Sequence, residues 1–107
     1  MPWYSYLAWF FAGAFLMNSV PHMVQGISGN KFQTPFARPP GVGESSSMVN
    51  VIWGFANLVI GGGLLHLTWP ASSPPPLLCL AALIGALALA LYLARHFSRV
   101  RHAPPQP

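Results

Sequence analysis

The chain has 107 residues, of which 53% are hydrophobic and only 6% carry a charge. A soluble domain carries about 25% charged residues, so this chain lacks the charge that a water-facing surface of ordinary size needs. Its five Lys and Arg form no basic stripe, and we therefore expect no nucleic acid partner. A single acid, Glu44, and a single cysteine, Cys79, exclude paired carboxylates, a Ser-His-Asp arrangement, an internal disulfide and a CxxC pair within the chain. We expect neither enzymatic activity nor a metal site.

Three apolar stretches predict an all-α integral membrane protein, a three-helix bundle. The spans run over about residues 3–25, 46–69 and 75–99, and each is long enough, at 1.5 Å per residue, to cross a hydrocarbon core about 30 Å thick. The first stretch has no basic segment before it and no cleavage site after it, so we expect a retained span rather than a signal peptide. Residues 1–102 are predicted to form one domain, and residues 103–107 a disordered tail.

The basic residues predict the orientation of the three spans. Lys31 and Arg38 follow the first span, and Arg95, Arg99 and Arg101 end the third, so all five fall on one side of the membrane. Because basic residues favour the cytoplasmic side, the N-terminus is expected outside and the C-terminus in the cytoplasm of a bacterium, with the chain in its inner membrane. Arg95, Arg99 and Arg101 are expected to contact lipid headgroups.

The second connection, residues 70–76, is short, uncharged and rich in proline, which predicts that the second and third helices form an antiparallel hairpin. Ala81, Gly85 and Ala88 give the third helix a stripe of small residues for packing. Cys79 is expected to be a small buried side chain.

Polar residues recur on one face of each of the first two helices. The spacing of three or four residues that places side chains on one face joins Asn18, His22 and Gln25 in the first helix, and Asn50, Trp53 and Asn57 in the second. We expect the two faces to meet and to form interhelical hydrogen bonds, with Gly54 allowing a close approach. Two interpretations stay open: a structural polar seam, or a cavity for a ligand, a lipid headgroup or a proton.

The first connection, residues 26–45, is longer than the joining of two helices requires. Its aromatic and basic residues Phe32, Phe36 and Arg38 are candidates for a docking surface. The alternative is a loop that lies on the membrane interface through the two phenylalanines.

Residues 21–46 read PHMVQGISGNKFQTPFARPPGVGESS, and residues 50–57 read NVIWGFAN. This part of the chain, about residues 18–57, resembles a group of short bacterial inner-membrane proteins of uncharacterised function. The shared elements are the Pro-His pair, the Phe-x-Thr-Pro-Phe segment, the Pro-Gly-x-Gly-x-Ser-Ser turn and the helix with Trp-Gly between two asparagines. The resemblance implies a retained multi-pass fold and supplies no activity or catalytic residues.

His66 is the candidate ligand for a cofactor. It follows Gly62 by four residues, which is similar to the pattern by which light-harvesting antenna helices coordinate bacteriochlorophyll, the small residue leaving room for the macrocycle. Pigment or haem binding through His66 is one hypothesis, and a histidine at the membrane interface is the other.

The sequence thus leaves three functional hypotheses. The first is an accessory or structural subunit of a larger membrane complex, such as an energy-transducing one, with other integral membrane subunits or further copies of itself as partners. The second is a protein that binds a lipid or a small molecule at the polar seam. The third is a pigment- or haem-binding subunit.

Overall fold

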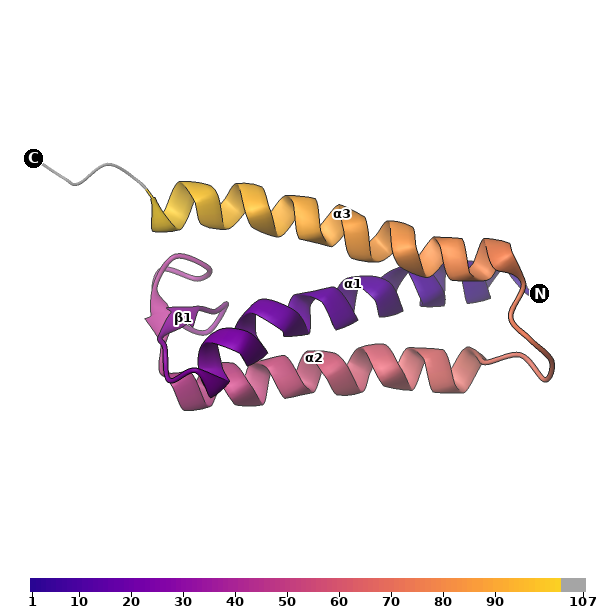
Figure 1. Cartoon of the computed structure of the whole chain (residues 1–107), viewed down its shortest axis with the longest axis horizontal. Coiled ribbons are helices and arrows are strands. Elements are labelled where there is room, and N and C mark those ends of the chain that lie inside the picture. Colours follow the sequence, from indigo (N-terminus) through magenta and orange to yellow (C-terminus); the bar gives the residue numbers. More distant parts are fainter. Residues whose placement is uncertain (103–107) are drawn as a thin grey trace, which may run out of the picture.

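The computed structural model describes residues 1–102, which form three long helices and one two-stranded antiparallel pair (Figure 1). The helices are α1 (Trp3–Ile27), α2 (Ser47–Thr68) and α3 (Pro76–Arg101), and the strands are β1 (Phe32–Gln33) and β2 (Glu44–Ser45). Each helix is long and apolar enough to cross a membrane. The predicted three-helix fold is confirmed at this level, and the helices begin and end within two residues of the expected ranges. The tail for which disorder was predicted lies outside the described residues.

The helix ends follow from local sequence. The Ser46 hydroxyl accepts a hydrogen bond from the Val49 N–H at 3.2 Å and so caps α2. Trp69, the residue before Pro70, is extended, because a following proline disfavours helical backbone, and α2 ends there. Pro76 opens α3, where its missing N–H costs no intrahelical hydrogen bond.

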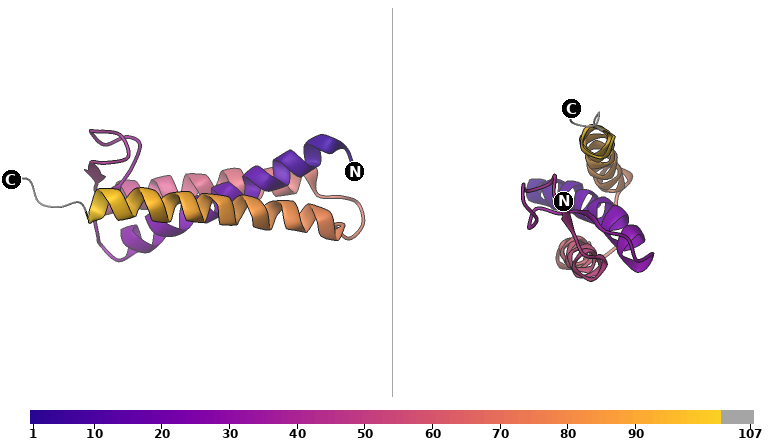
Figure 2. Two further views of the ribbon diagram at one scale, coloured as in Figure 1. Left: turned by 90° about the horizontal axis from the view of Figure 1, so that it is seen from above. Right: turned by 90° about the vertical axis from the view of Figure 1, so that its left-hand side faces the viewer.

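The helix α1 lies between α2 and α3, as the end-on view in Figure 2 shows. It packs along both of them, whereas α2 and α3 make almost no direct contact with each other. The helices α2 and α3 run antiparallel, as predicted, but they do not pack on each other as the two helices of a hairpin do (Figure 1). The physical reason is that α1 offers small residues to both neighbours, and the extended connection at residues 69–75 is long enough to pass from one side of α1 to the other.

Glycines set the distance between the helices. A Cβ atom added to Gly85 would overlap the carbonyl oxygen of Phe10, and one added to Gly13 would overlap that of Ala82, so α1 and α3 touch backbone to backbone. On the other side of α1, a Cβ on Gly54 would lie 2.7 Å from the Met23 Cγ atom, which agrees with the close approach predicted there.

The interior is unusually polar, and the exterior is apolar. Buried polar side chains outnumber buried apolar ones within residues 1–102; they are Ser5, Ser19, His22, Gln33, Thr34, Asn50 and Asn57. The leucines of α3 are largely exposed, and so is Cys79, contrary to the prediction of a buried thiol. Leu78 is the residue of this turn that faces inward, with no exposed surface, so its neighbour Cys79 points outward.

Candidate functional site

The two predicted polar faces meet in the structure. The Asn18 side-chain amide donates to the Asn57 Oδ1 atom at 3.0 Å, and His22 Nδ1 lies 2.8 Å from Asn50 Oδ1. Both pairs join α1 to α2. Gln25, by contrast, does not take part in this contact, because its Oε1 atom accepts a hydrogen bond from Asn30 at the end of the helix.

Asn50 connects the helices to the loop. It has no exposed surface, and its Nδ2 atom donates to the carbonyl oxygens of Phe32, Ser45 and Ser46 at 3.0–3.2 Å. These three acceptors fix the orientation of the amide, so Oδ1 must be the atom that accepts from His22. His22 therefore carries its proton on Nδ1, and its Nε2 atom has no hydrogen-bond partner within residues 1–102.

Trp53 lies beside this network with its indole N–H unused. The Nε1 atom is buried and has no hydrogen-bond partner among residues 1–102. A buried donor without an acceptor costs about 1–3 kcal/mol. The Trp53 ring contacts His22 edge-on, with 6.4 Å between ring centroids, and Phe36 at 4.9 Å.

The loop candidates separate into two kinds. Phe32 is only 4% exposed, and its ring packs on Phe97 of α3 with 4.6 Å between centroids, so its assignment to a docking surface is wrong. Its place in β1 turns the ring toward the helices. Phe36, at 64%, and Arg38 are exposed and remain available to a partner.

The three arginines of α3 also differ. Arg101 Nη1 donates to the Gln33 Oε1 atom at 2.9 Å and lies 3.5 Å from a carboxylate oxygen of Glu44, while its guanidinium covers the Phe32 ring. Arg101 therefore also contacts the loop, which folds back over the end of α3, and its contact with lipid headgroups stays a prediction. Arg95 and Arg99 are exposed and have no such partners within residues 1–102.

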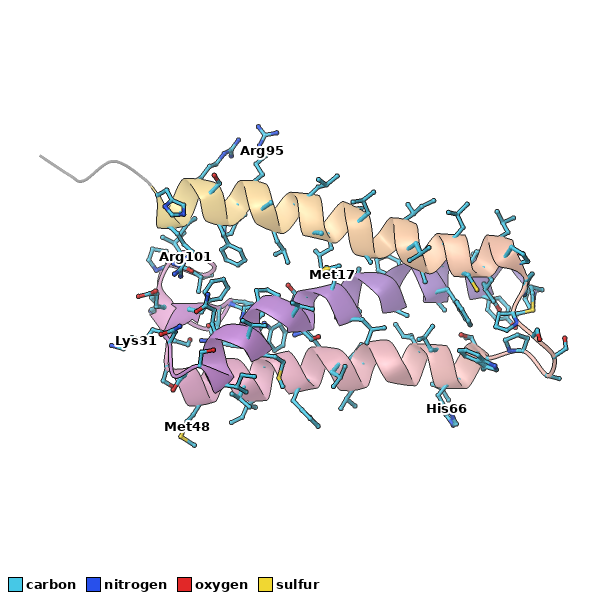
Figure 3. All side chains as sticks on the ribbon, in the orientation of Figure 1. Met17, Lys31, Met48, His66, Arg95 and Arg101 are labelled. Atoms are coloured by element: carbon cyan, nitrogen blue, oxygen red, sulfur yellow. The ribbon has the colours of Figure 1, made fainter. Side chains whose placement is uncertain are left out.

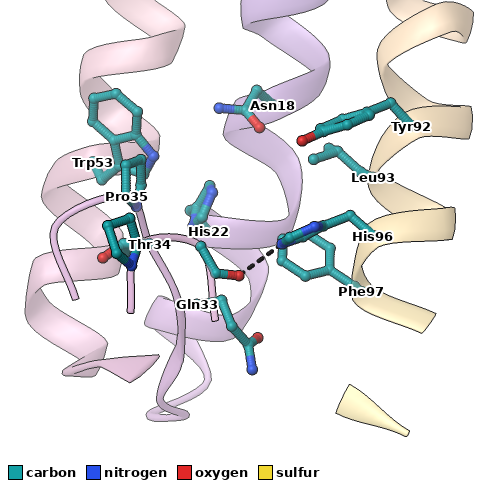
Figure 4. Close-up of a pocket in the computed structure, with 12 residues that line it drawn as sticks. Asn18, His22, Gln33, Thr34, Pro35, Trp53, Tyr92, Leu93, His96 and Phe97 are labelled. Atoms are coloured by element: carbon teal, nitrogen blue, oxygen red, sulfur yellow. Dashed lines mark hydrogen bonds between the residues drawn. The ribbon is translucent and has the colours of Figure 1, made fainter. Parts of the chain in front are cut away.

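The loop is ordered around two hydrogen-bonded points. The Thr34 hydroxyl accepts N–H bonds from Phe36 and Ala37 and shares a 2.6 Å hydrogen bond with the Ser45 hydroxyl. The His96 Nε2–H group of α3 donates to the Gly41 carbonyl oxygen at 2.7 Å, as the dashed line in Figure 4 shows. Because a carbonyl can only accept, Nε2 of His96 carries a proton, and in the neutral ring Nδ1 is then an acceptor.

A pocket of about 310 Å³ opens where α2 and α3 stand apart (Figure 4). Its lining comes from all three helices and the loop: Asn18, His22, Gln33, Thr34, Pro35, Pro40, Gly41, Trp53, Tyr92, Leu93, His96 and Phe97. A second, mainly apolar hollow of about 380 Å³ continues it along the helices, lined by Phe11, Ala14, Phe15, Asn18, Trp53, Asn57, Leu89, Tyr92 and Leu93. Four residues line both spaces, namely Asn18, Trp53, Tyr92 and Leu93, so we treat them as one α2–α3 groove with a polar head and an apolar tail.

Sequence reasoning missed the contribution of α3 to this groove. Tyr92 and His96 stack with their ring centroids 6.0 Å apart. Their spacing of four residues in an otherwise apolar helix was the signal that could have found them. None of the described residues that line the polar head is Lys, Arg, Asp or Glu.

His66 lies far from the groove. It is exposed on α2 and points away from the bundle in Figure 3. No atoms lie within 4 Å of the position that a Cβ on Gly62 would occupy, so the space that a macrocycle needs beside His66 is open. Residues 1–102 contain no cluster of three His, Cys, Asp or Glu side chains able to hold a metal ion. Pigment or haem binding through His66 stays a prediction, and an absorbance spectrum of the purified protein without a pigment or haem band would contradict it.

No family model matches the chain, and neither a curated protein nor a solved structure matches it. The resemblance of residues 18–57 to short bacterial inner-membrane proteins stays a prediction.

Proposed function

We propose that this protein spans the bacterial inner membrane three times and binds an amphiphilic molecule of that membrane in the α2–α3 groove. The proposed orientation puts the N-terminus outside and the loop, with the end of α3, on the cytoplasmic side. The labelled basic residues Lys31, Arg95 and Arg101 all lie at the loop end of the bundle (Figure 3), and the preference of basic residues for the cytoplasmic side supports this orientation.

The observation that carries the proposal is the division of the groove into a polar head and an apolar tail. The polar head lies at the loop end, beside His22, Thr34 and His96, and the apolar tail runs toward the middle of the helices. An amphiphile in the cytoplasmic leaflet is arranged in the same way along the membrane normal, with its headgroup at the cytoplasmic surface and its apolar chain toward the middle of the bilayer. It would place its headgroup under the loop and its chain between α2 and α3.

Access to the groove follows from the arrangement of the helices. Because α2 and α3 pack on α1 and hardly touch each other, none of the three described helices closes the groove on the side away from α1. A lipid-like molecule could therefore enter sideways from the bilayer. A volume of about 310 Å³ for the polar head is at the lower end of the range of small-molecule sites.

Filling the apolar tail of the groove should abolish binding. Ala14 lines this tail, and a phenylalanine in its place would occupy the space of a lipid chain. We expect native mass spectra of the protein in mild detergent to show a retained amphiphile for the natural chain and none for Ala14→Phe. The matched control is Ala88→Phe, at an exposed position of α3 outside the groove, which should keep the amphiphile.

Leu89→Trp, also in the apolar tail, repeats the test if Ala14→Phe disturbs the helices by circular dichroism. Equal retention of the amphiphile by both groove variants and by the control would overturn the proposal. So would a natural chain that carries no amphiphile and takes none up from added bacterial lipids.

A second candidate is the accessory or structural subunit, and the open glycines of α2 favour it. A Cβ added to Gly62 or Gly63 would have no atom within 4 Å, and the outward face of α3 exposes Leu77, Leu83 and Leu91. Small residues on an outer helix face permit the close approach of another spanning helix. The same native spectra would then contain a partner subunit, or further copies of the chain, in fixed stoichiometry, and a monomer in every preparation would contradict this candidate.

A further inference from the structure

We infer that the groove selects amphiphiles whose headgroup is uncharged and bears a hydroxyl group, such as a diacylglycerol or a quinol, over phosphate-bearing lipids. This inference rests on the proposed function and adds the class of ligand. It follows from the donors, acceptors and charges that line the polar head of the groove.

One fully buried donor in the polar head lacks an acceptor among residues 1–102. The Trp53 indole N–H has no partner within residues 1–102, and Figure 4 shows its nitrogen on the side of the ring that faces Asn18 and His22. Trp53 itself lines the polar head. The ligand must therefore supply an acceptor.

Acceptors in the polar head lack donors. Asn18 uses its amide N–H toward Asn57, which leaves its Oδ1 atom free. His22 donates from Nδ1 to Asn50, and His96 donates from Nε2 to Gly41, so the neutral rings present Nε2 of His22 and Nδ1 of His96 as acceptors. The ligand must therefore also supply at least one O–H or N–H donor, and a hydroxyl group can donate and accept at once.

The charges around the groove argue against an ionic headgroup. No Lys, Arg, Asp or Glu among the described residues lines the polar head, and the side chains of Arg101 and Glu44 are paired with each other outside it. A phosphate would meet no Lys or Arg among these lining residues, and burial of an unpaired charge is costly. An ammonium group would meet acceptors but could not accept from Trp53. The uncharged hydroxyl satisfies both sets of groups.

The test measures binding of four amphiphiles to the full-length protein in phosphatidylcholine nanodiscs. Dioleoylglycerol and dioleoylphosphatidic acid form a matched pair that differs only in a hydroxyl against a phosphate. Decylubiquinol and decylubiquinone form a second pair that differs in the O–H donors. We expect dioleoylglycerol to bind at least about tenfold more tightly than the phosphatidic acid, a difference of 1.4 kcal/mol. The ratio of the affinities for dioleoylglycerol and decylubiquinol shows which of these two kinds of hydroxyl-bearing amphiphile the groove prefers.

Trp53→Phe removes the donor and keeps an aromatic ring. It should weaken binding of dioleoylglycerol about five- to tenfold, the effect of one hydrogen bond of typical strength. Trp69→Phe is the matched control and should leave binding unchanged, since the Trp69 ring packs at a tilt against Trp9 at the other end of the bundle. If Trp53→Phe does not fold, Asn18→Leu tests the acceptor side, with the same expected direction.

The outcomes separate the two proposals. Phosphatidic acid bound as tightly as dioleoylglycerol, or more tightly, overturns the inference about the headgroup and leaves lipid binding in the groove intact. An unchanged affinity of Trp53→Phe for dioleoylglycerol also overturns it. Absence of binding by all four amphiphiles overturns the proposed function itself.

Discussion

Replacement of Gly85 by alanine is expected to lower the free energy of unfolding by about 3 kcal/mol. The added Cβ would overlap the carbonyl oxygen of Phe10, and a backbone atom cannot rotate away as a side chain can. The two helices would have to separate along their contact, which includes the reciprocal approach of Gly13 to Ala82. Unfolding of the purified protein by increasing SDS in mixed micelles, followed by circular dichroism, measures the change.

Gly62→Ala is the matched control for this variant. The substitution is the same and the position is also within a helix, but nothing lies within 4 Å of the added Cβ. Alanine at a compatible helical position stabilises by about 0.4–1 kcal/mol, so the control should unfold at an equal or higher SDS fraction. Equal destabilisation by the two substitutions would show that helix propensity, rather than the contact between α1 and α3, decides the effect.

The sequence was sufficient for the elements that depend on local pattern. Apolar length and composition predicted the three helices, and the spacing of Asn18 and His22 against Asn50 and Asn57 predicted the polar contact between α1 and α2. Polar groups within long apolar segments have few ways to be satisfied, so their pairing is strongly constrained. The pairing of these polar residues can therefore be predicted from the sequence alone.

Which helices pack against each other could not be predicted in the same way. The short connection at residues 70–76 suggested that α2 and α3 pack together, but loop length limits only the distance between their ends. Which faces pack is decided by the close backbone contacts at Gly13 and Gly85, and sequence alone does not say which small residues meet. Because the sequence did not predict that α3 packs on α1, the contacts of His96 and Arg101 with the loop were missed.

Replacement of Asn50 by alanine is expected to lower the free energy of unfolding by about 2–4 kcal/mol, from four lost hydrogen bonds and the burial of their partners. The side chain has no exposed surface, and it bonds His22 and the carbonyl groups of Phe32, Ser45 and Ser46. Denaturation by SDS measures the loss. Hydrogen exchange should also become faster at the amides of residues 32–45, because Asn50 joins the loop to the helices.

Asn30→Ala is the control, because it removes an amide of the same size that is exposed and, within residues 1–102, hydrogen-bonded through its side chain only to Gln25. Its effect on the free energy of unfolding should stay within about 0.5 kcal/mol, as for most surface substitutions.

The Asn50→Ala variant also tests the groove, since Asn50 fixes the His22 proton on Nδ1 and holds the loop that covers the polar head. Loss of ligand binding in Asn50→Ala together with faster exchange in the loop would tie the headgroup site to this network. Faster hydrogen exchange with unchanged ligand binding would show that Asn50 stabilises the fold and does not contribute to the headgroup site.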